Sequence, residues 1–276
     1  MRKILLLVVA FTAIMASAQV LNVASIEKLD IPVNSDLKIA AISPNGAYVL
    51  TTSQSNTGLQ KFDLVTKEVT KISDAEGAGY NVEISVDSKE VIYQELTYSV
   101  DRSRMTALKR YEFQTAKNST IVKATRDVHQ ARMRRAITPT VFIKGGKIQV
   151  SLGTITKQLS PNGQGTYIWA SLSPDGNKIL YYNNGTWFCN VDGTNPQRIG
   201  NFRAPRWYNN NVVVGMNDVD NGYHVISSEI VACTLDGDKQ VLTNSSIMAM
   251  YPYVSADGSK IVCSTPSGEA YLINIK

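Results

Sequence analysis

Ser173-Pro174-Asp175-Gly176, followed at once by Asn177-Lys178-Ile179-Leu180-Tyr181-Tyr182, is the stretch that decides the fold of this chain. Proline presets the backbone of a β-turn, aspartate can bond its own main chain, and glycine accepts the positive φ that reverses the chain direction. Strand-forming residues follow directly. The stretch therefore predicts a β-hairpin.

Similar turn sequences, each followed by strand-forming residues, recur along the chain and begin at Ser43, Ser85 and Ser255. Ser43 and Ser85 are 42 residues apart, whereas 88 and 82 residues separate the next two pairs of turns, close to two periods each. Two further repeats with altered turns are therefore predicted. We assign them to 142–150, around Gly145-Gly146, and to 205–214, where an asparagine run replaces Pro-Asp-Gly.

Each repeat also contains a second turn between short alternating runs, as in 62–69, 189–196 and 233–242. Two hairpins give four strands in about 40 residues, which is the content of a propeller blade. The last repeat has room for only three strands, and 20–29 is typical of an additional strand. We therefore predict an all-β fold, a six-bladed β-propeller of four-stranded blades, with the ring closed by pairing of the N-terminal strand with the last blade.

The S-P-D-G-x-x-I/V-x-Y turn and the following xDxx(D)G hairpin resemble the PD40, or WD40-like, repeat in the propeller domain of the TolB family. The resemblance covers 37–276 and is best at Ser173–Gly176. It implies a propeller in a bacterial envelope protein. The α/β domain that TolB places before its propeller has no counterpart in this sequence, so the resemblance implies the fold more firmly than a role in the Tol system.

The first residues are typical of a secretory signal peptide. Arg2 and Lys3 precede an apolar run, 4–14, and Ala16-Ser17-Ala18 forms a small-residue cleavage site. We therefore predict a signal peptide over 1–18, a single propeller domain over 19–276, and a periplasmic or secreted protein. No later stretch is long and apolar enough for a membrane span.

The remaining composition narrows the class of partner. Removal of Arg2 and Lys3 leaves 26 basic against 23 acidic residues, a balance that does not favour a nucleic-acid partner. Cys189, Cys233 and Cys263 lie in strand-like runs and have no metal-site spacing, so we expect buried thiols, with one disulfide between repeats as the alternative.

Catalytic chemistry has few candidates in this sequence. The two histidines, His129 and His224, cannot form a multi-histidine metal centre, and no G-x-S-x-G motif is present. We therefore predict no catalytic residues and no resident cofactor. The polar loop around Asp218 and Asp220 is the one candidate Ca²⁺ site, but its spacing does not fit an EF-hand and an ordinary solvated loop is the competing interpretation.

Propellers bind ligands at the mouth of the central channel, on the loops that enter each innermost strand and those that join the second and third strands. Aromatic and arginine side chains are common anchors of interfaces, although aromatics before the turn also pack between blades. The mapping predicts a partner-binding rim of Tyr80, Arg132, Arg134, Tyr167, Trp169, Arg206, Trp207, Tyr223, His224 and Tyr251.

A longer excursion at 95–108, with Arg102, Arg104 and the basic residues that follow it, allows two interpretations: a basic face for an acidic partner or a set of solvated strand faces. The function most consistent with these features is a non-catalytic binding module for an envelope protein or a glycan. A carbohydrate-active enzyme, either a lyase or a glycoside hydrolase, and a structural spacer in an envelope complex are the alternatives. The oligomeric state stays open.

Overall fold

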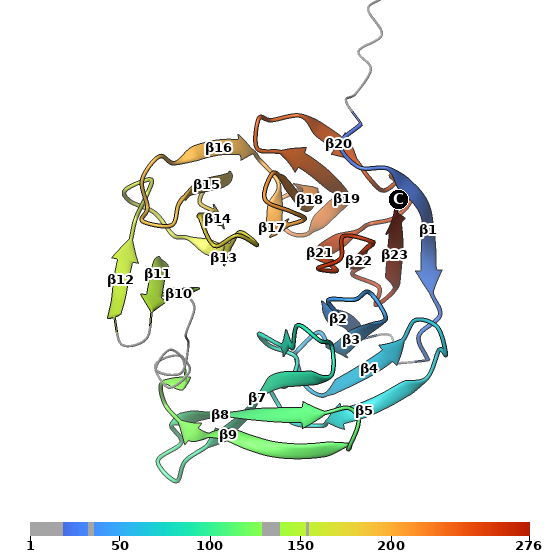
Figure 1. The fold of residues 1–276 in the computed structure, drawn as a ribbon, viewed down its shortest axis with the longest axis vertical. Coiled ribbons are helices and arrows are strands. Elements are labelled where there is room, and N and C mark those ends of the chain that lie inside the picture. Colours follow the sequence, from blue (N-terminus) through green and yellow to red (C-terminus); the bar gives the residue numbers. More distant parts are fainter. Residues whose placement is uncertain (1–18, 33–35, 129–138, 153–154) are drawn as a thin grey trace, which may run out of the picture.

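Six antiparallel sheets follow one another around a ring (Figure 1). The computed structural model describes residues 19–32, 36–128, 139–152 and 155–276. Five of the sheets have four strands, and three strands of the sheet in blade three are described. The prediction of a six-bladed, all-β propeller is therefore confirmed.

The strands are numbered in chain order. Blade one contains β2 (Leu37–Ile42), β3 (Tyr48–Ser53), β4 (Leu59–Asp63) and β5 (Val69–Ser73), and blade two contains β6 (Glu83–Ile84), β7 (Glu90–Tyr98), β8 (Arg104–Glu112) and β9 (Lys117–Thr125). Blade three contains β10 (Thr140–Lys144), β11 (Lys147–Leu152) and β12 (Ile155–Leu159), and blade four contains β13 (Ile168–Leu172), β14 (Lys178–Tyr182), β15 (Thr186–Asn190) and β16 (Gln197–Gly200). Blade five contains β17 (Arg203–Trp207), β18 (Val212–Asp220), β19 (Val225–Thr234) and β20 (Lys239–Val241), and blade six contains β21 (Met250–Val254), β22 (Lys260–Ser264), β23 (Ala270–Ile275) and β1 (Val23–Leu29).

The N-terminal strand closes the ring. β1 runs antiparallel to β23, from Val23 opposite Ile275 to Leu29 opposite Ala270, and supplies the outermost strand of blade six. This pairing covers the strand edge that blade six would otherwise expose, as the sequence predicted. The side chain of Gln240 in blade five holds the segment before β1: its Oε1 accepts from the amides of residues 20 and 21 at 2.7 Å each, and its Nε2 donates to the carbonyl of residue 21 at 3.0 Å.

The repeated turn is organised by its buried serine. Ser173 Oγ accepts from the amide of Lys178 at 2.9 Å and donates to Asp175 Oδ1 at 2.5 Å. The turns at Ser85 and Ser255 repeat both bonds with their own aspartates. These turns connect the first and second strands of their blades, so their role is structural.

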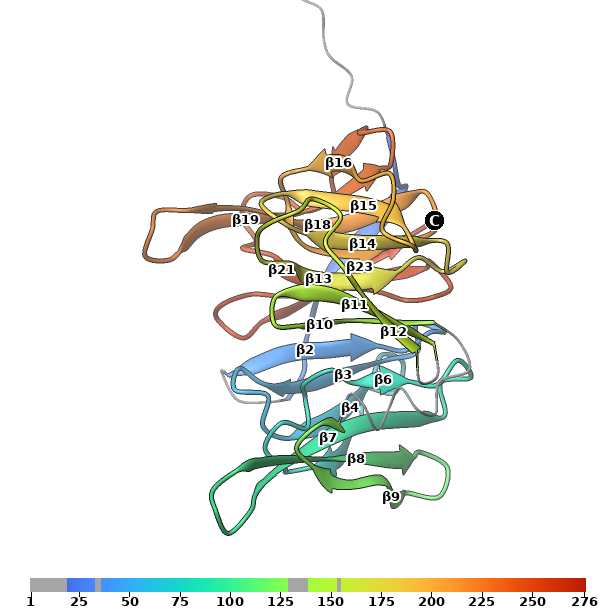
Figure 2. The same ribbon diagram turned by 90° about the vertical axis from the view of Figure 1, so that its left-hand side faces the viewer.

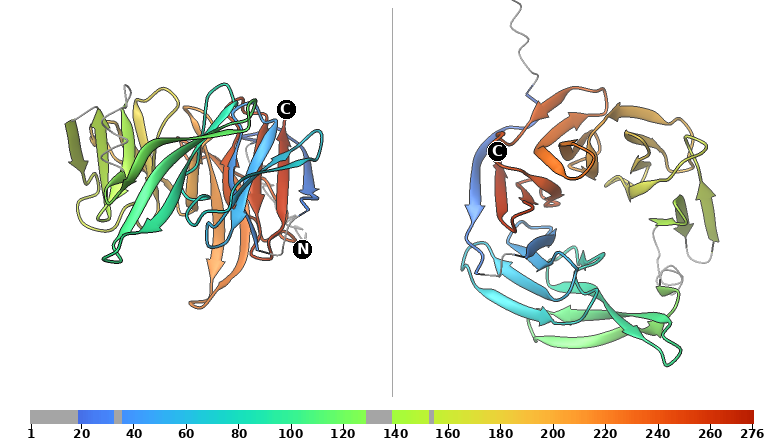
Figure 3. Two further views of the ribbon diagram at one scale, coloured as in Figure 1. Left: turned by 90° about the horizontal axis from the view of Figure 1, so that it is seen from below. Right: turned by 180° about the vertical axis from the view of Figure 1, so that it is seen from behind.

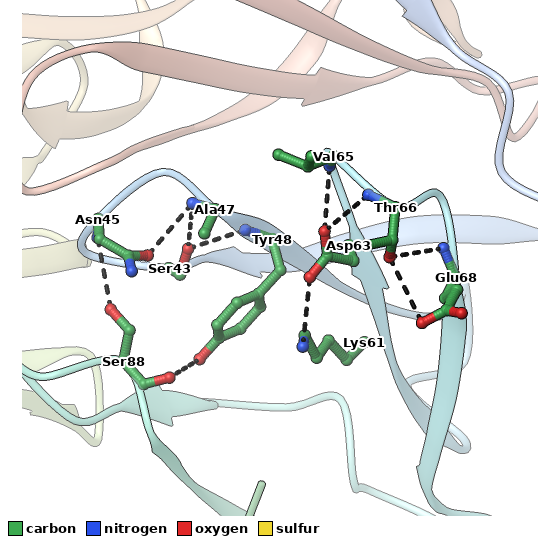
Figure 4. Close-up of polar contacts among 10 residues, drawn as sticks. All are labelled: Ser43, Asn45, Ala47, Tyr48, Lys61, Asp63, Val65, Thr66, Glu68 and Ser88. Atoms are coloured by element: carbon green, nitrogen blue, oxygen red, sulfur yellow. Dashed lines mark hydrogen bonds and ion pairs between the residues drawn. The ribbon is translucent and has the colours of Figure 1, made fainter. Parts of the chain in front are cut away.

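Figure 4 shows the blade-one version of this turn and its contact with blade two. Ser43 Oγ accepts from the amides of Ala47 and Tyr48 at 2.9 and 3.0 Å, respectively. The Tyr48 hydroxyl then donates to the carbonyl of Ser88, in the next blade's turn, at 2.9 Å. The same turn that reverses the chain therefore also ties neighbouring blades together.

The hydrophobic core lies between the faces of neighbouring sheets. Each of five buried clusters draws on two adjacent blades; one joins Val49 and Phe62 of blade one to Val262 of blade six. Full burial of one such side chain stabilises the fold by roughly 1.5–3 kcal/mol. Cys189, Cys233 and Cys263 are free and buried in these layers, which confirms the expectation of buried thiols.

Blade three corrects one assignment made from the sequence. The Gly145-Gly146 turn was placed between the first and second strands, in the position of Pro-Asp-Gly. In the structure the carbonyl of Gly146 accepts a hydrogen bond from the amide of Tyr167, which lies at the entry to blade four. In blade one the equivalent bond runs from the amide of Gly79, at the entry to blade two, to the carbonyl of Asn56. Asn56 lies between the second and third strands, so the glycine turn occupies that position. A glycine pair suits both turns, and the sequence spacing alone did not separate them.

The predicted signal peptide, residues 1–18, lies outside the described residues. Within the described ranges, no helix is long and apolar enough to cross a membrane.

Candidate functional site

Two long β-hairpins project from the same face of the ring, β7–β8 from blade two and β18–β19 from blade five (Figures 2 and 3). Their strands have nine or ten residues, whereas most strands of the other blades have four to six. We call this side of the ring the hairpin face; it also carries the loops that enter the innermost strands. Blades two and five are opposite members of a six-membered ring, so the hairpins lie on opposite sides of the central axis.

The blade-five hairpin extends beyond both of its neighbouring strands. β17 pairs with β18 as far as Met216, and β20 pairs with β19 only from Val231 onward. The segments on either side of the turn therefore form a two-stranded ribbon, which is marginally stable without support. The guanidinium of Arg203 supplies it: Nε donates to Asp218 Oδ1 at 3.0 Å while Nη2 contacts Oδ2, and the Asp218 side chain is only 4% exposed.

The tip of this hairpin is capped by its own side chains. Asp220 Oδ1 accepts from the amide of Gly222 at 2.5 Å, and Asn221 Oδ1 accepts from the amides of Tyr223 and His224 at 3.0 Å each. Gly222 has a φ of +89°, a conformation that side chains with a Cβ rarely adopt. The capped turn presents the Tyr223 side chain to solvent, with 94% of its surface exposed.

The blade-two hairpin has a similarly ordered tip. Asp101 accepts from the Ser99 hydroxyl, from the Ser103 hydroxyl at 3.0 Å, and from Arg126 Nη2 at 2.7 Å. The hydrogen bond from Ser99 is the largest cause that lowers the pKa of Asp101 below its usual value. The tip is therefore held in one conformation around a carboxylate that stays ionised at neutral pH.

The innermost strands share a β-bulge near the hairpin face. The pairing registers of β13, β17 and β21 shift at Trp169, Ala204 and Tyr251, which have φ values of 54°, 46° and 52°. Asn81, before β6, has a φ of 51°. Such a bulge bends its strand and re-aims side chains. Because unrelated side chains occupy the same conformation in successive blades, we attribute it to the repeat and not to one ligand.

The predicted rim residues are either exposed, packed between or within blades, or outside the described residues. Tyr80, Tyr223 and Tyr251 are exposed and belong to the hairpin face. His224 is exposed at the blade-five tip. Arg132 and Arg134 lie outside the described residues.

The other predicted rim residues pack between or within blades. Tyr167 is fully buried, and its hydroxyl accepts from the amide of Asn162 at 2.9 Å, so its assignment to the rim was wrong. The indole of Trp207 donates to the carbonyl of Ser171 in blade four at 3.3 Å.

Two further rim candidates are half-buried in aromatic contacts. Arg206 lies over the ring of Tyr253 in blade six, with 4.6 Å from the guanidinium carbon to the ring centroid. Trp169 makes an edge contact with Tyr182, the ring centroids being 5.6 Å apart. These side chains support the packing of blades four to six.

The predicted Ca²⁺ loop has little free ligand capacity. Asp218 is paired with Arg203, and Asp220 caps its own turn. Among the described residues, no three His, Cys, Asp or Glu side chains are grouped so that they could hold a metal ion. Burial also raises the pKa of the Cys189 thiol to about 12, which suppresses the reactive thiolate at neutral pH.

Sequence reasoning missed three exposed apolar residues of the hairpins, Val100, Val219 and Ile226. Nothing in the local sequence marks these aliphatic residues as exposed, and only the lengths of the two hairpins place them beyond the blades. The signal was available in principle, because 212–234 holds two strand-like runs that are longer than a blade strand requires.

Comparison with known proteins identifies the fold. No protein-family model and no curated protein matches the sequence. Among solved structures, a TolB-like protein from Agrobacterium tumefaciens is 16% identical, with a TM-score of 0.57 over 87% of this chain and 90% of that one. The oligogalacturonate lyase of Vibrio parahaemolyticus is 11% identical, with a TM-score of 0.43 over 84% of this chain and 76% of that one. The first comparison confirms that this chain has the fold of a TolB-like six-bladed propeller.

Proposed function

We propose that this protein is a non-catalytic binding module of the periplasm or the cell exterior, and that its partner, an envelope protein or a glycan, binds at the hairpin face. One observation carries the proposal. The four exposed tyrosines of the described residues, Tyr80, Tyr98, Tyr223 and Tyr251, all belong to that face. Tyrosine contributes a large apolar ring and a hydroxyl at little entropic cost, so it is enriched in the binding surfaces of proteins and stacks on sugars.

The opposite face has a different character. It consists of turns such as those at Ser43 and Ser173, whose polar groups are bonded within the turn. Its exposed apolar residues include Val65 and Val86, which occur singly on separate turns and need no functional explanation. This contrast between the two faces supports the choice of the hairpin face.

The placement of His224 supports binding over catalysis. A general acid or base works in a site that holds the substrate and excludes water. His224 is instead exposed at the tip of a projecting hairpin, and its amide is used to cap the turn with Asn221. The blade-five loop therefore fits a contact surface better than the active site of a lyase or hydrolase.

Capture from a cell-envelope extract with matched variants tests the proposal. The bait is the chain from residue 19, immobilised as the unchanged protein, as Tyr98→Ser/Tyr223→Ser, and as the control Val65→Ser/Val86→Ser on the opposite face. We expect a partner, identified by mass spectrometry or on a glycan array, that the control retains and the tyrosine variant binds at least about tenfold more weakly. Equal binding by all three baits, or no ligand at micromolar concentration, would refute the proposal.

A further inference from the structure

The charges on the two hairpins are unequal once internal ion pairs are removed. In blade two, Glu95 pairs with Lys109 at 3.2 Å, and Asp101 pairs with Arg126 at 2.7 Å. Glu90 pairs with Arg110 at 3.6 Å near the base of the same hairpin. The cations left over toward the tip are Arg102 and Arg104, both exposed and without an ion pair among the described residues.

The blade-five hairpin is left with the opposite charge. Arg203 neutralises Asp218. Asp220, which is exposed, and Glu229, which is half-buried, form no ion pair with any described residue. One hairpin therefore presents two arginines, and the hairpin across the ring presents two carboxylates, that form no ion pair with a described residue.

Both hairpins also carry apolar side chains that are exposed to solvent. Tyr98 and Val100 are exposed on the blade-two hairpin, and Val219, Tyr223 and Ile226 on the blade-five hairpin. An interface commonly combines an apolar centre with charged groups around it, which set the orientation of the partners. Each hairpin has both elements, and the charges of the two are complementary.

This arrangement has the symmetry that a face-to-face pair requires. Consider a dimer in which the hairpin faces of two propellers face each other, with the two-fold axis parallel to the planes of the two rings and midway between them. When this axis is perpendicular to the line that joins blades two and five, it places blade two of one copy opposite blade five of the other. The blade-two hairpin of one copy then meets the blade-five hairpin of the other, and the same contact forms twice. Figure 3 shows the two hairpins projecting in the same direction, as such a contact requires.

We propose that the partner of the hairpin face is a second copy of this chain, bound face to face, with Arg102 and Arg104 of each copy opposite Asp220 and Glu229 of the other. The inference rests on the proposed function, because it takes the hairpin face as the binding surface. It names the partner from the charge pattern, which no single protomer satisfies within itself.

Exchange of the charges tests the pairing directly. Variant one is Arg102→Glu/Arg104→Glu, which makes both of its hairpins acidic; variant two is Asp220→Lys/Glu229→Lys, which makes both of its hairpins basic. Each variant alone should lose the dimer, because like charges then meet at both contacts. An equimolar mixture should recover it, because both contacts of the mixed pair are again complementary.

Sedimentation velocity of the chain from residue 19, over about 1–100 μM and at about 50 mM salt, measures the result under weak screening. We expect a dimer for the unchanged protein, a dissociation constant raised at least about tenfold for each variant alone, and recovery in the mixture. The control Lys67→Glu/Lys89→Glu alters the net charge as much as variant one does, but on the opposite face, and should stay dimeric. Thermal unfolding of each variant establishes that it is folded.

The outcomes separate this inference from the proposed function. An unchanged protein that stays monomeric up to about 100 μM, or a mixture no more associated than its folded components, would overturn the inference. In that event, loss of an envelope partner by the tyrosine variant would still support the proposed function. A dimer recovered by the mixture, together with empty captures, would refute a separate envelope protein or glycan as the partner and would support a second copy of this chain as the partner of the hairpin face.

Discussion

The side chain of Gln240 holds the segment that leads into the closing strand, so its truncation should loosen the ring at one defined place. Gln240→Ala removes three hydrogen bonds, two from the amides of Val20 and Leu21 and one to the carbonyl of Leu21. With about 1 kcal/mol for each bond, the expected loss in the free energy of unfolding is about 3 kcal/mol. Gln240→Glu keeps the acceptor for both amides and loses only the donor, so about 1 kcal/mol is expected.

Urea denaturation monitored by tryptophan fluorescence measures both variants, and the expected loss for the alanine variant corresponds to a midpoint lower by about 1 M. Gln197→Ala is the matched control, because Gln197 is an exposed residue on the outermost strand of the neighbouring blade. Hydrogen exchange should show faster exchange of the Val20 and Leu21 amides in Gln240→Ala. A loss within about 0.5 kcal/mol of the control, or a glutamate variant as unstable as the alanine variant, would refute the reasoning.

Three other predictions concern acid stability, thiol reactivity and packing. The hydrogen bond from Ser173 is the largest cause that lowers the pKa of the Asp175 carboxyl. The stability that this carboxylate provides is therefore present above the unfolded-state pKa of about 3.9 and is lost as the pH falls through the lower folded value. Denaturation between about pH 2 and pH 7 should show this loss of stability, and a smaller loss for Asp175→Asn. Burial raises the pKa of the Cys189 and Cys263 thiols to about 12, so a thiol reagent should label them only after unfolding, and rapid labelling of the native protein would contradict the burial. Gly215→Ala would place a Cβ 2.4 Å from the Phe202 ring and 2.9 Å from a backbone oxygen, so calorimetry should show a loss of roughly 1–3 kcal/mol, and an unchanged melting temperature would argue against that packing.

The repeat period and the turn chemistry made the fold predictable. Turn residues act over a few positions, so Ser173–Gly176 and its three counterparts fixed four blades, and the spacing between them required two more. Asn209 shows why one altered turn still works: its Oδ1 accepts from the amides of Asn211 and Val212 at 2.8 Å each, and so replaces the Pro-Asp-Gly chemistry. The Gly145-Gly146 turn joins the second and third strands of its blade and not the first and second. The residues of the turn do not distinguish these two positions, because turn chemistry does not depend on the order of the strands.

The candidate site was less predictable because burial and pairing depend on distant residues. Tyr167 and Tyr223 both occur in polar segments that contain glycine and asparagine, yet one is fully buried and the other almost fully exposed. Tyr167 is buried because its hydroxyl bonds Asn162 and its ring packs against Tyr181. Tyr223 is exposed because the blade-five hairpin extends beyond the ends of its neighbouring strands.

Charge is the clearest case of a property that sequence counts misrepresent. The sequence left two interpretations for the basic residues around 95–126, a basic face for an acidic partner or a set of solvated strand faces, and in the structure Lys109, Arg110 and Arg126 are paired with carboxylates of the same blade. An exposed pair of this kind contributes at most about 1 kcal/mol to stability, yet it cancels the charge that a partner would meet. What a partner meets on the blade-two hairpin is therefore Arg102 and Arg104 alone, too few to hold a polyanion and enough to orient an interface whose other side carries two carboxylates.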